Sequence, residues 1–117
     1  MTPKVLVVDD DPDIVFVLRV TLEAAGFSVV EAENGAMGLE VAKRERPDIV
    51  LTDLMMPVMD GHEMIRRLRA DPETSGLPII VVSAKPGRID GVEAVIRKPW
   101  RNEELVECLR QLTERAS

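Results

Sequence analysis

Short, strongly apolar segments alternate along the sequence with longer segments that have the apolar periodicity of a helix. The apolar segments are rich in valine and isoleucine, which is typical of strands buried on both faces. Strands that alternate with helices pair in parallel, because each helix crosses over the sheet between two strands. The pattern therefore predicts an α/β domain with one parallel sheet covered on both faces.

Start and stop residues divide the chain into five strands and four helices. Asp11 and Asn34 are expected N-caps, Pro12 suits a first helical position, and Gly26 and Pro47 each follow a helix end. The predicted strands cover residues 4–8, 28–31, 48–52, 78–82 and 93–96. The predicted helices cover residues 12–25, 35–46, 61–70 and 102–114.

One connection is too short for a crossover helix. Ten residues, SAKPGRIDGV, lie between the fourth and fifth predicted strands, whereas a strand–helix–strand crossover needs about a dozen or more. We therefore expect a flavodoxin-like, doubly wound, five-stranded sheet of order 2-1-3-4-5, in which the helix after strand 4 is shortened or missing.

Composition bounds the function of what we expect to be one domain, residues 1–117. Fifteen Lys and Arg stand against 21 Asp and Glu, a net charge of −6, which argues against direct binding of nucleic acid. The single cysteine, Cys108, cannot form an internal disulfide. The N-terminus has no apolar signal segment, and no apolar run is long enough for a membrane span. We expect a cytoplasmic protein with no contact to membranes.

Acidic residues follow two strands that we expect to be neighbours. Asp9 and Asp10 end the first strand and Asp53 follows the third, while Ser83 and Lys98 end the fourth and fifth. Ligands of open parallel sheets bind at the carboxyl ends of the strands, where the strand order reverses. Carboxylates so close repel one another, by about 1 kcal/mol per pair in water and about 4 near a protein surface. Hard oxygen ligands with excess negative charge predict a Mg²⁺ site, and without a cation the carboxyl pKa values should be raised.

Each of these residues also has an ordinary structural explanation. Taken alone, DDDPD favours a helix N-cap, and we assign Asp11 and Asp13 to that cap rather than to the metal. Ser83 could serve only to close a strand end, and Lys98 alone could be an exposed lysine. An EF-hand loop is excluded because Ile14 stands where glycine is required.

Four motifs, VLVVDDD, LTDLMMPVMDG, IIVVSA and IRKPW, occur in an order that resembles the response regulator receiver domain of two-component signalling. The resemblance covers nearly the whole chain. It implies that Asp53 is the phosphoacceptor, which takes a phosphoryl group from a phosphohistidine of a sensor histidine kinase or phosphotransfer protein. Ser83 would donate a hydrogen bond to the phosphoryl group and Lys98 would pair with it. Lysine suits that role as a compact point charge.

The same resemblance implies a Mg²⁺ cofactor. Asp10 and Asp53 would be its ligands, Asp9 would support it within the acidic pair, and Met55 would contribute its backbone carbonyl. Such a domain is a signalling switch for a downstream effector protein or domain. It is an enzyme only toward its own phosphotransfer and dephosphorylation.

Two departures from the family pattern concern signal output. Val95 occupies the place of an aromatic residue that changes rotamer in many receivers, and the segment 84–91 is shorter than usual. Our hypothesis is that the phosphorylation chemistry persists while signal output is relocated or mechanically different. Met55 and Lys85 flank the expected path of the hydrolytic water, and neither orients water as an acid or amide does. We therefore expect slow self-dephosphorylation.

Two other classes of protein remain open. A pseudo-receiver would keep the fold as an interaction module without phosphorylation. A haloacid-dehalogenase-like phosphatase would use Asp9 and Asp11, but it leaves Asp53 unexplained and the chain has no room for a cap domain. The sequence is compatible with a stand-alone receiver and with a domain excised from a longer protein.

Overall fold

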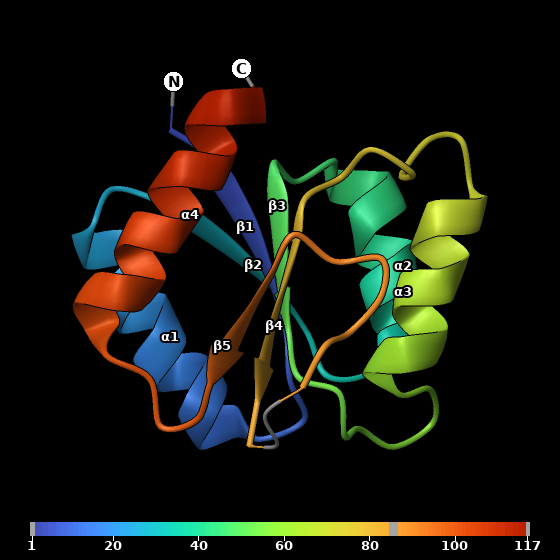
Figure 1. Cartoon of the computed structure of the whole chain (residues 1–117), viewed down its shortest axis with the longest axis horizontal. Coiled ribbons are helices and arrows are strands. Elements are labelled where there is room, and N and C mark those ends of the chain that lie inside the picture. The colour runs from blue at the N-terminus through green and yellow to red at the C-terminus, as the bar shows by residue number, and fades with distance from the viewer. Residues whose placement is uncertain (1, 85–86, 117) are drawn as a thin grey trace.

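The computed structural model has one five-stranded sheet between two layers of helices (Figure 1). The structure describes residues 2–84 and 87–116, and the side chains of residues 2–84 and 87–114. Within this part the elements are β1 (Lys4–Val8), α1 (Pro12–Ala24), β2 (Ser28–Ala32), α2 (Gly35–Glu45), β3 (Ile49–Thr52), α3 (Gly61–Ala70), β4 (Ile79–Ser83), β5 (Ala94–Arg97) and α4 (Asn102–Ala116). All neighbouring strands are parallel, in the order β2-β1-β3-β4-β5. The predicted doubly wound sheet is confirmed.

Each face of the sheet has its own apolar core. Successive strand residues point to opposite faces, so Val5 and Val7 of β1 pack with α1 and α4, whereas Leu6 and Val8 pack with α2 and α3. Figure 1 shows these two helix pairs on opposite sides of the strands. Burial on both faces explains why the strands are apolar runs rather than alternating sequences.

The predicted caps of the first two helices are confirmed, and the third helix has a cap of the same kind. The side chains of Asp11, Asn34 and Asp60 cap α1, α2 and α3, each accepting a hydrogen bond from a backbone N–H two or three residues further on. Element ends differ from the predictions by one or two residues, because helix ends fray and strand ends depend on pairing with a neighbouring strand. No helix in the described part of the chain combines the length and apolar character needed to cross a lipid bilayer.

In its described part, the connection between β4 and β5 is a loop where a crossover helix would otherwise stand. The described residues of this connection, 84 and 87–93, form loop and turn without helix, which confirms the expected loss. We call residues 87–93 the strap. Its Ile89 and Val92 pack against the core on the α2–α3 side of the sheet, so the strap covers the apolar surface that a crossover helix would otherwise bury.

Arg69, near the end of α3, holds the strap in place. Its guanidinium donates hydrogen bonds to the carbonyl oxygens of Leu77 at 2.6 Å and Gly91 at 2.8 Å. It also forms an ion pair of 2.8 Å with Glu93, whose carboxylate accepts a hydrogen bond from the Ile79 N–H. One side chain thus links α3, the turn before β4 and the strap.

Candidate functional site

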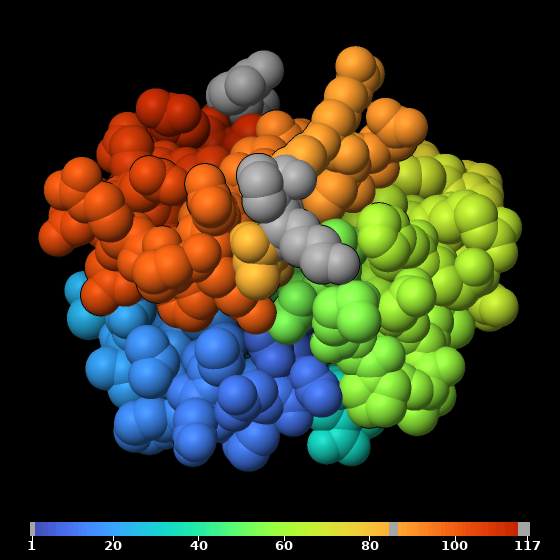
Figure 2. All heavy atoms as spheres, turned by 60° about the horizontal axis from the view of Figure 1, so that its bottom comes forward, coloured from blue at the N-terminus to red at the C-terminus, as the bar shows by residue number. Residues whose placement is uncertain are grey.

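The ends of β1 and β3 bring three carboxylates together. Val8 and Thr52 are partners in the parallel ladder, and the N–H of Asp53 donates to the carbonyl of Val8 at 3.0 Å. The residues that follow β1 and β3 therefore lie side by side at the same edge of the sheet. Asp9, Asp10 and Asp53 each offer a carboxylate oxygen, and these oxygens all lie within 4.8 Å of one another. Figure 2 shows this edge of the molecule, where blue, green and orange segments distant in sequence adjoin.

Asp9 is the buried member of the cluster. Its side chain accepts a hydrogen bond from the N–H of Asp11 at 2.9 Å, which fixes its orientation. Burial raises the pKa of Asp9, and the neighbouring charges of Asp53 and Asp10 raise it further, against the opposing effects of that hydrogen bond and of Lys98. The direction agrees with the expectation for crowded carboxylates, but burial contributes more to it than the neighbouring charges do.

Asp53 is held on both carboxylate oxygens. One oxygen lies 2.9 Å from Lys98 Nζ, and the other accepts a hydrogen bond from the N–H of Leu54 at 2.6 Å. Lys98 itself is placed by the sheet, because its N–H donates to the carbonyl of Ser83 at 2.9 Å at the end of β4. The side chains of Asp53 and Lys98 are 15% and 25% exposed, so the ion pair is shielded and yet open to a ligand.

Ser83 and Met55 lie at the same edge of the sheet. Ser83 is the last residue of β4 and is buried, with β3 on one side and β5 on the other. Met55 follows Asp53 in the loop to α3, and its side chain is 81% exposed. Met64 of α3, in contrast, is fully buried. Lys85 lies outside the described residues.

The cap assignments of the acidic run are confirmed. Asp11 accepts a hydrogen bond from the N–H of Asp13 at the start of α1, and neither residue belongs to the cluster of three carboxylates. Trp100 packs against the core beside α4, and Asp53 and Lys98 line the same small cavity as Trp100.

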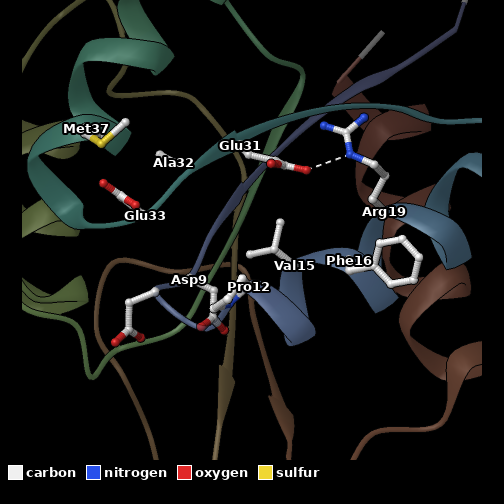
Figure 3. Close-up of a pocket in the computed structure, with 10 residues that line it drawn as sticks. Asp9, Pro12, Val15, Phe16, Arg19, Glu31, Ala32, Glu33 and Met37 are labelled. Atoms are coloured by element: carbon white, nitrogen blue, oxygen red, sulfur yellow. Dashed lines mark hydrogen bonds and ion pairs between the residues drawn. The ribbon is translucent and has the colours of Figure 1, made fainter.

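A cavity of about 560 Å³ beside the carboxylates was not expected from the sequence. It lies between α1 and the β2–α2 connection, and Figure 3 shows Asp9 at one end and the Arg19–Glu31 ion pair at the other. Phe16 lines it and is 67% exposed. The one sequence feature that could have indicated this cavity is Phe16, an aromatic residue that does not lie on the inward face of its helix. It becomes informative only when the structure places β2 beside α1.

Two further residues escaped notice in the sequence. Gly35 and Gly61 are the first residues of α2 and α3, and both touch the backbone of the loop that connects β3 to α3. In the sequence, each glycine looks like an ordinary first residue of a helix. The loop residues that it contacts cannot be recognised there, because no local pattern links them to the glycine.

The family model for the response regulator receiver domain matches residues 5–110. The chain is 36% identical over 113 residues to PilH of Pseudomonas aeruginosa, an alignment that covers 91% of this chain and 93% of PilH. It is 38% identical over 117 residues to the DNA-binding response regulator MtrA of Mycolicibacterium smegmatis, where 94% of this chain aligns with 50% of MtrA.

Solved structures agree with the sequence comparisons. The receiver domain of a sensor histidine kinase from Pseudomonas aeruginosa, crystallised with a magnesium ion coordinated in its active site cleft, has a TM-score of 0.90 and 27% identity to this chain, covering 97% of this chain and 99% of that one. The sequence family and the fold thus point the same way. The chain belongs to the family of response regulator receiver domains of two-component signal transduction.

Proposed function

We propose that Asp53 accepts a phosphoryl group from the phosphohistidine of a sensor histidine kinase or phosphotransfer protein, with Mg²⁺ as cofactor. The observation that carries the proposal is the meeting of three carboxylate oxygens within 4.8 Å, with Lys98 at 2.9 Å from one of them. A cluster with this much negative charge is unfavourable unless a cation shares it. The acceptor, its counter-charge and a set of metal ligands therefore lie together at the switch point of the sheet.

The donor set fits a magnesium ion. Mg²⁺ prefers hard oxygen ligands and commonly takes one or two carboxylates while it keeps several waters. Asp10 and Asp53 would supply carboxylates, Met55 would supply its backbone carbonyl, and buried Asp9 would complete the acidic pair. When bound, the metal supplies neutralisation of charge on the transferred phosphoryl group.

Asp53, Lys98 and Ser83 would each have a separate role in the phosphoryl transfer. A carboxylate oxygen of Asp53 attacks phosphorus in line with the donor histidine, so that a P–O bond forms as the P–N bond breaks. The Lys98 ammonium offsets the charge that Asp53 gains. Ser83, whose strand lies between those of Asp53 and Lys98, donates its hydroxyl hydrogen bond to a phosphoryl oxygen. Placement and charge account for most of the catalysis of such a step.

Phosphorylation would control binding of a downstream effector in the cytoplasm. The relatives differ in how much of their length this chain covers, since it aligns with most of PilH and with half of a DNA-binding regulator. Val95 is 36% exposed on β5, and a valine cannot make the large rotamer change that an aromatic residue makes. Signal output through the loop 84–91 and β5 is therefore mechanically different here. Met55, exposed at the site, has no group that orients water, so we infer slow self-dephosphorylation.

The experiment is incubation with acetyl phosphate and Mg²⁺, followed by measurement of intact mass. The wild type should gain one phosphoryl group, and Asp53→Asn should gain none. Asp48→Asn is the matched control, because Asp48 is an exposed carboxylate at the opposite end of β3, and it should behave as the wild type does. Chelation of the metal should abolish the gain.

The alternative is a pseudo-receiver that acts as an interaction module without phosphorylation. The missing crossover helix and the valine at position 95 favour it, because both change the surface through which a phosphorylated receiver would signal. A wild-type chain that binds no Mg²⁺ and gains no phosphoryl group would support this alternative and overturn the proposal.

A further inference from the structure

The loop between β3 and α3, residues 54–60, accepts hydrogen bonds near both of its ends from backbone amides of two different helices. Gly61, the first residue of α3, donates its N–H to the carbonyl of Leu54 at 2.9 Å. Gly35, the first residue of α2, donates its N–H to the carbonyl of Met59 at 2.9 Å. The first N–H groups of a helix have no acceptor inside the helix. Here they find acceptors on the loop that carries the Met55 carbonyl.

The close approach at Gly35 leaves no room for a side chain. A Cβ atom at this position would lie 2.6 Å from the Met59 carbonyl oxygen and 3.0 Å from the Asp60 carbonyl oxygen, where an ordinary contact is 3.4–4 Å. The obstruction is backbone, so it cannot move aside as the end of a flexible side chain can. Any larger residue at position 35 must displace the end of the loop.

A displacement at Met59 is passed along a stiff segment. The Met59 N–H donates to the carbonyl of Pro57 at 2.7 Å and closes a γ-turn on Val58, whose φ is 67°. Pro57 has a fixed φ of its own. A β-branched residue with positive φ is rarely tolerated and persists only where its surroundings hold it. We therefore expect a shift at Met59 to be carried toward Met55 rather than absorbed at residues 57–59.

We propose that Gly35 is a positioning residue for the magnesium site, acting through the loop 54–60 on the Met55 carbonyl. The inference rests on the proposed function, because it concerns the same site. Gly35 itself touches neither metal nor phosphoryl group. Its part is to let α2 sit against the loop and fix the carbonyl at the distance that the metal requires.

The choice of cation separates positioning from general destabilisation. Mg²⁺ demands near-ideal octahedral geometry with short bonds, whereas Ca²⁺ accepts longer and irregular ones. A displaced carbonyl should therefore penalise Mg²⁺ more than Ca²⁺. A loss of stability without a change of geometry should not alter the ratio of the two affinities.

The test is titration of Gly35→Ala with Mg²⁺ and with Ca²⁺, followed by the fluorescence of Trp100, which shares a cavity with Asp53 and Lys98. Gly38→Ala is the matched control on the same helix, because its Cβ would meet only side-chain atoms, the nearest being Met64 Sδ at 2.6 Å. We expect Gly35→Ala to weaken Mg²⁺ binding about tenfold or more, the scale found when outer residues of metal sites are changed. Its affinity for Ca²⁺ should fall less, and Gly38→Ala should keep the wild-type ratio.

Hydrogen exchange of the wild type provides a second measurement that needs no variant to fold. Coupling is reciprocal, so saturation with Mg²⁺ should slow exchange of the Gly35 amide while leaving the Gly38 amide unchanged. Gly35→Ala with wild-type Mg²⁺ affinity would overturn the inference, as would an unchanged Gly35 amide. A wild type that binds no Mg²⁺ would instead overturn the proposed function, so the two failures are distinguishable.

Discussion

Lys98 Nζ lies 2.9 Å from Asp53 Oδ2, although 45 residues separate the two in the sequence. The ion pair joins the chain that leaves β5 to the chain that leaves β3, and β4 lies between them. It places a single positive charge beside three carboxylates. This cation stabilises the cluster before any metal is bound.

Replacement of Lys98 by methionine should destabilise the metal-free protein. The remaining carboxylates would be partly buried without a counter-charge, and we expect a loss on the order of 2 kcal/mol. Saturating Mg²⁺ should recover part of that loss, because the metal replaces the missing charge. Urea unfolding with and without Mg²⁺ measures both effects. Lys43→Met is the control, because its ion pair with Asp71 is at the surface and should matter little.

Replacement of Asp9 by asparagine should have the opposite effect. Asparagine keeps the oxygen that accepts the hydrogen bond from the Asp11 N–H and removes one buried negative charge. We expect the metal-free variant to be more stable than the wild type by about 1 kcal/mol, and to lose most of the stabilisation by Mg²⁺. Thermal unfolding with and without the metal tests this. A metal-free variant less stable than the wild type would contradict the view that the carboxylates repel one another.

Val58→Asn should stabilise the protein. A positive φ is rarely tolerated by a β-branched residue, and asparagine tolerates it better. Because the Val58 side chain is 85% exposed, little packing is lost, and we expect a gain of up to about 1 kcal/mol. Val17→Asn applies the same substitution to an exposed valine of α1 and should give no gain. Chemical denaturation of both variants decides the point.

Arg69→Ala should release the strap. The substitution removes the hydrogen bonds to Leu77 and Gly91 and the ion pair with Glu93, and we expect a loss of about 2–3 kcal/mol. Hydrogen exchange should accelerate most in residues 87–93. Arg67→Ala, on the same helix, removes only a surface ion pair with Glu63 and should leave the strap protected. Uniform acceleration across the whole chain would argue against a local role for Arg69.

Cys108 should react slowly with thiol reagents. Burial raises the pKa of its thiol above the ordinary 9.0, and the nearby charge of Glu104 adds to the effect. The reactive thiolate is therefore scarcer at a given pH than in an unfolded chain, and the alkylation rate should continue to rise beyond pH 9. Labelling with iodoacetamide across a pH series, with the urea-unfolded protein as reference, tests this. Equal rates for the folded and unfolded chains would contradict it.

The alternation of apolar strands with periodic helices was enough to predict the order of elements, the parallel sheet and the missing crossover helix. These features depend on local pattern and on the length of connections. The positions of Asp9, Asp10, Asp53 and Lys98 after their strands also followed, because parallel strands end at the same edge. The exposure of the Met55 side chain and the burial of Met64 could not be told apart in this way, because nothing local distinguishes the two methionines.

The amino-acid sequence by itself determined which residues end the strands. It therefore determined which charged groups meet at one edge of the sheet. The tertiary structure alone decided how those groups are held. The hydrogen bond from Gly35 to Met59 and those from Arg69 to the strap connect residues of separate elements. The cavity beside Phe16 is likewise lined by residues of separate elements. The physical reason is that local pattern sets the direction in which each side chain leaves its element, whereas distances between elements arise only when all of them pack against the same sheet.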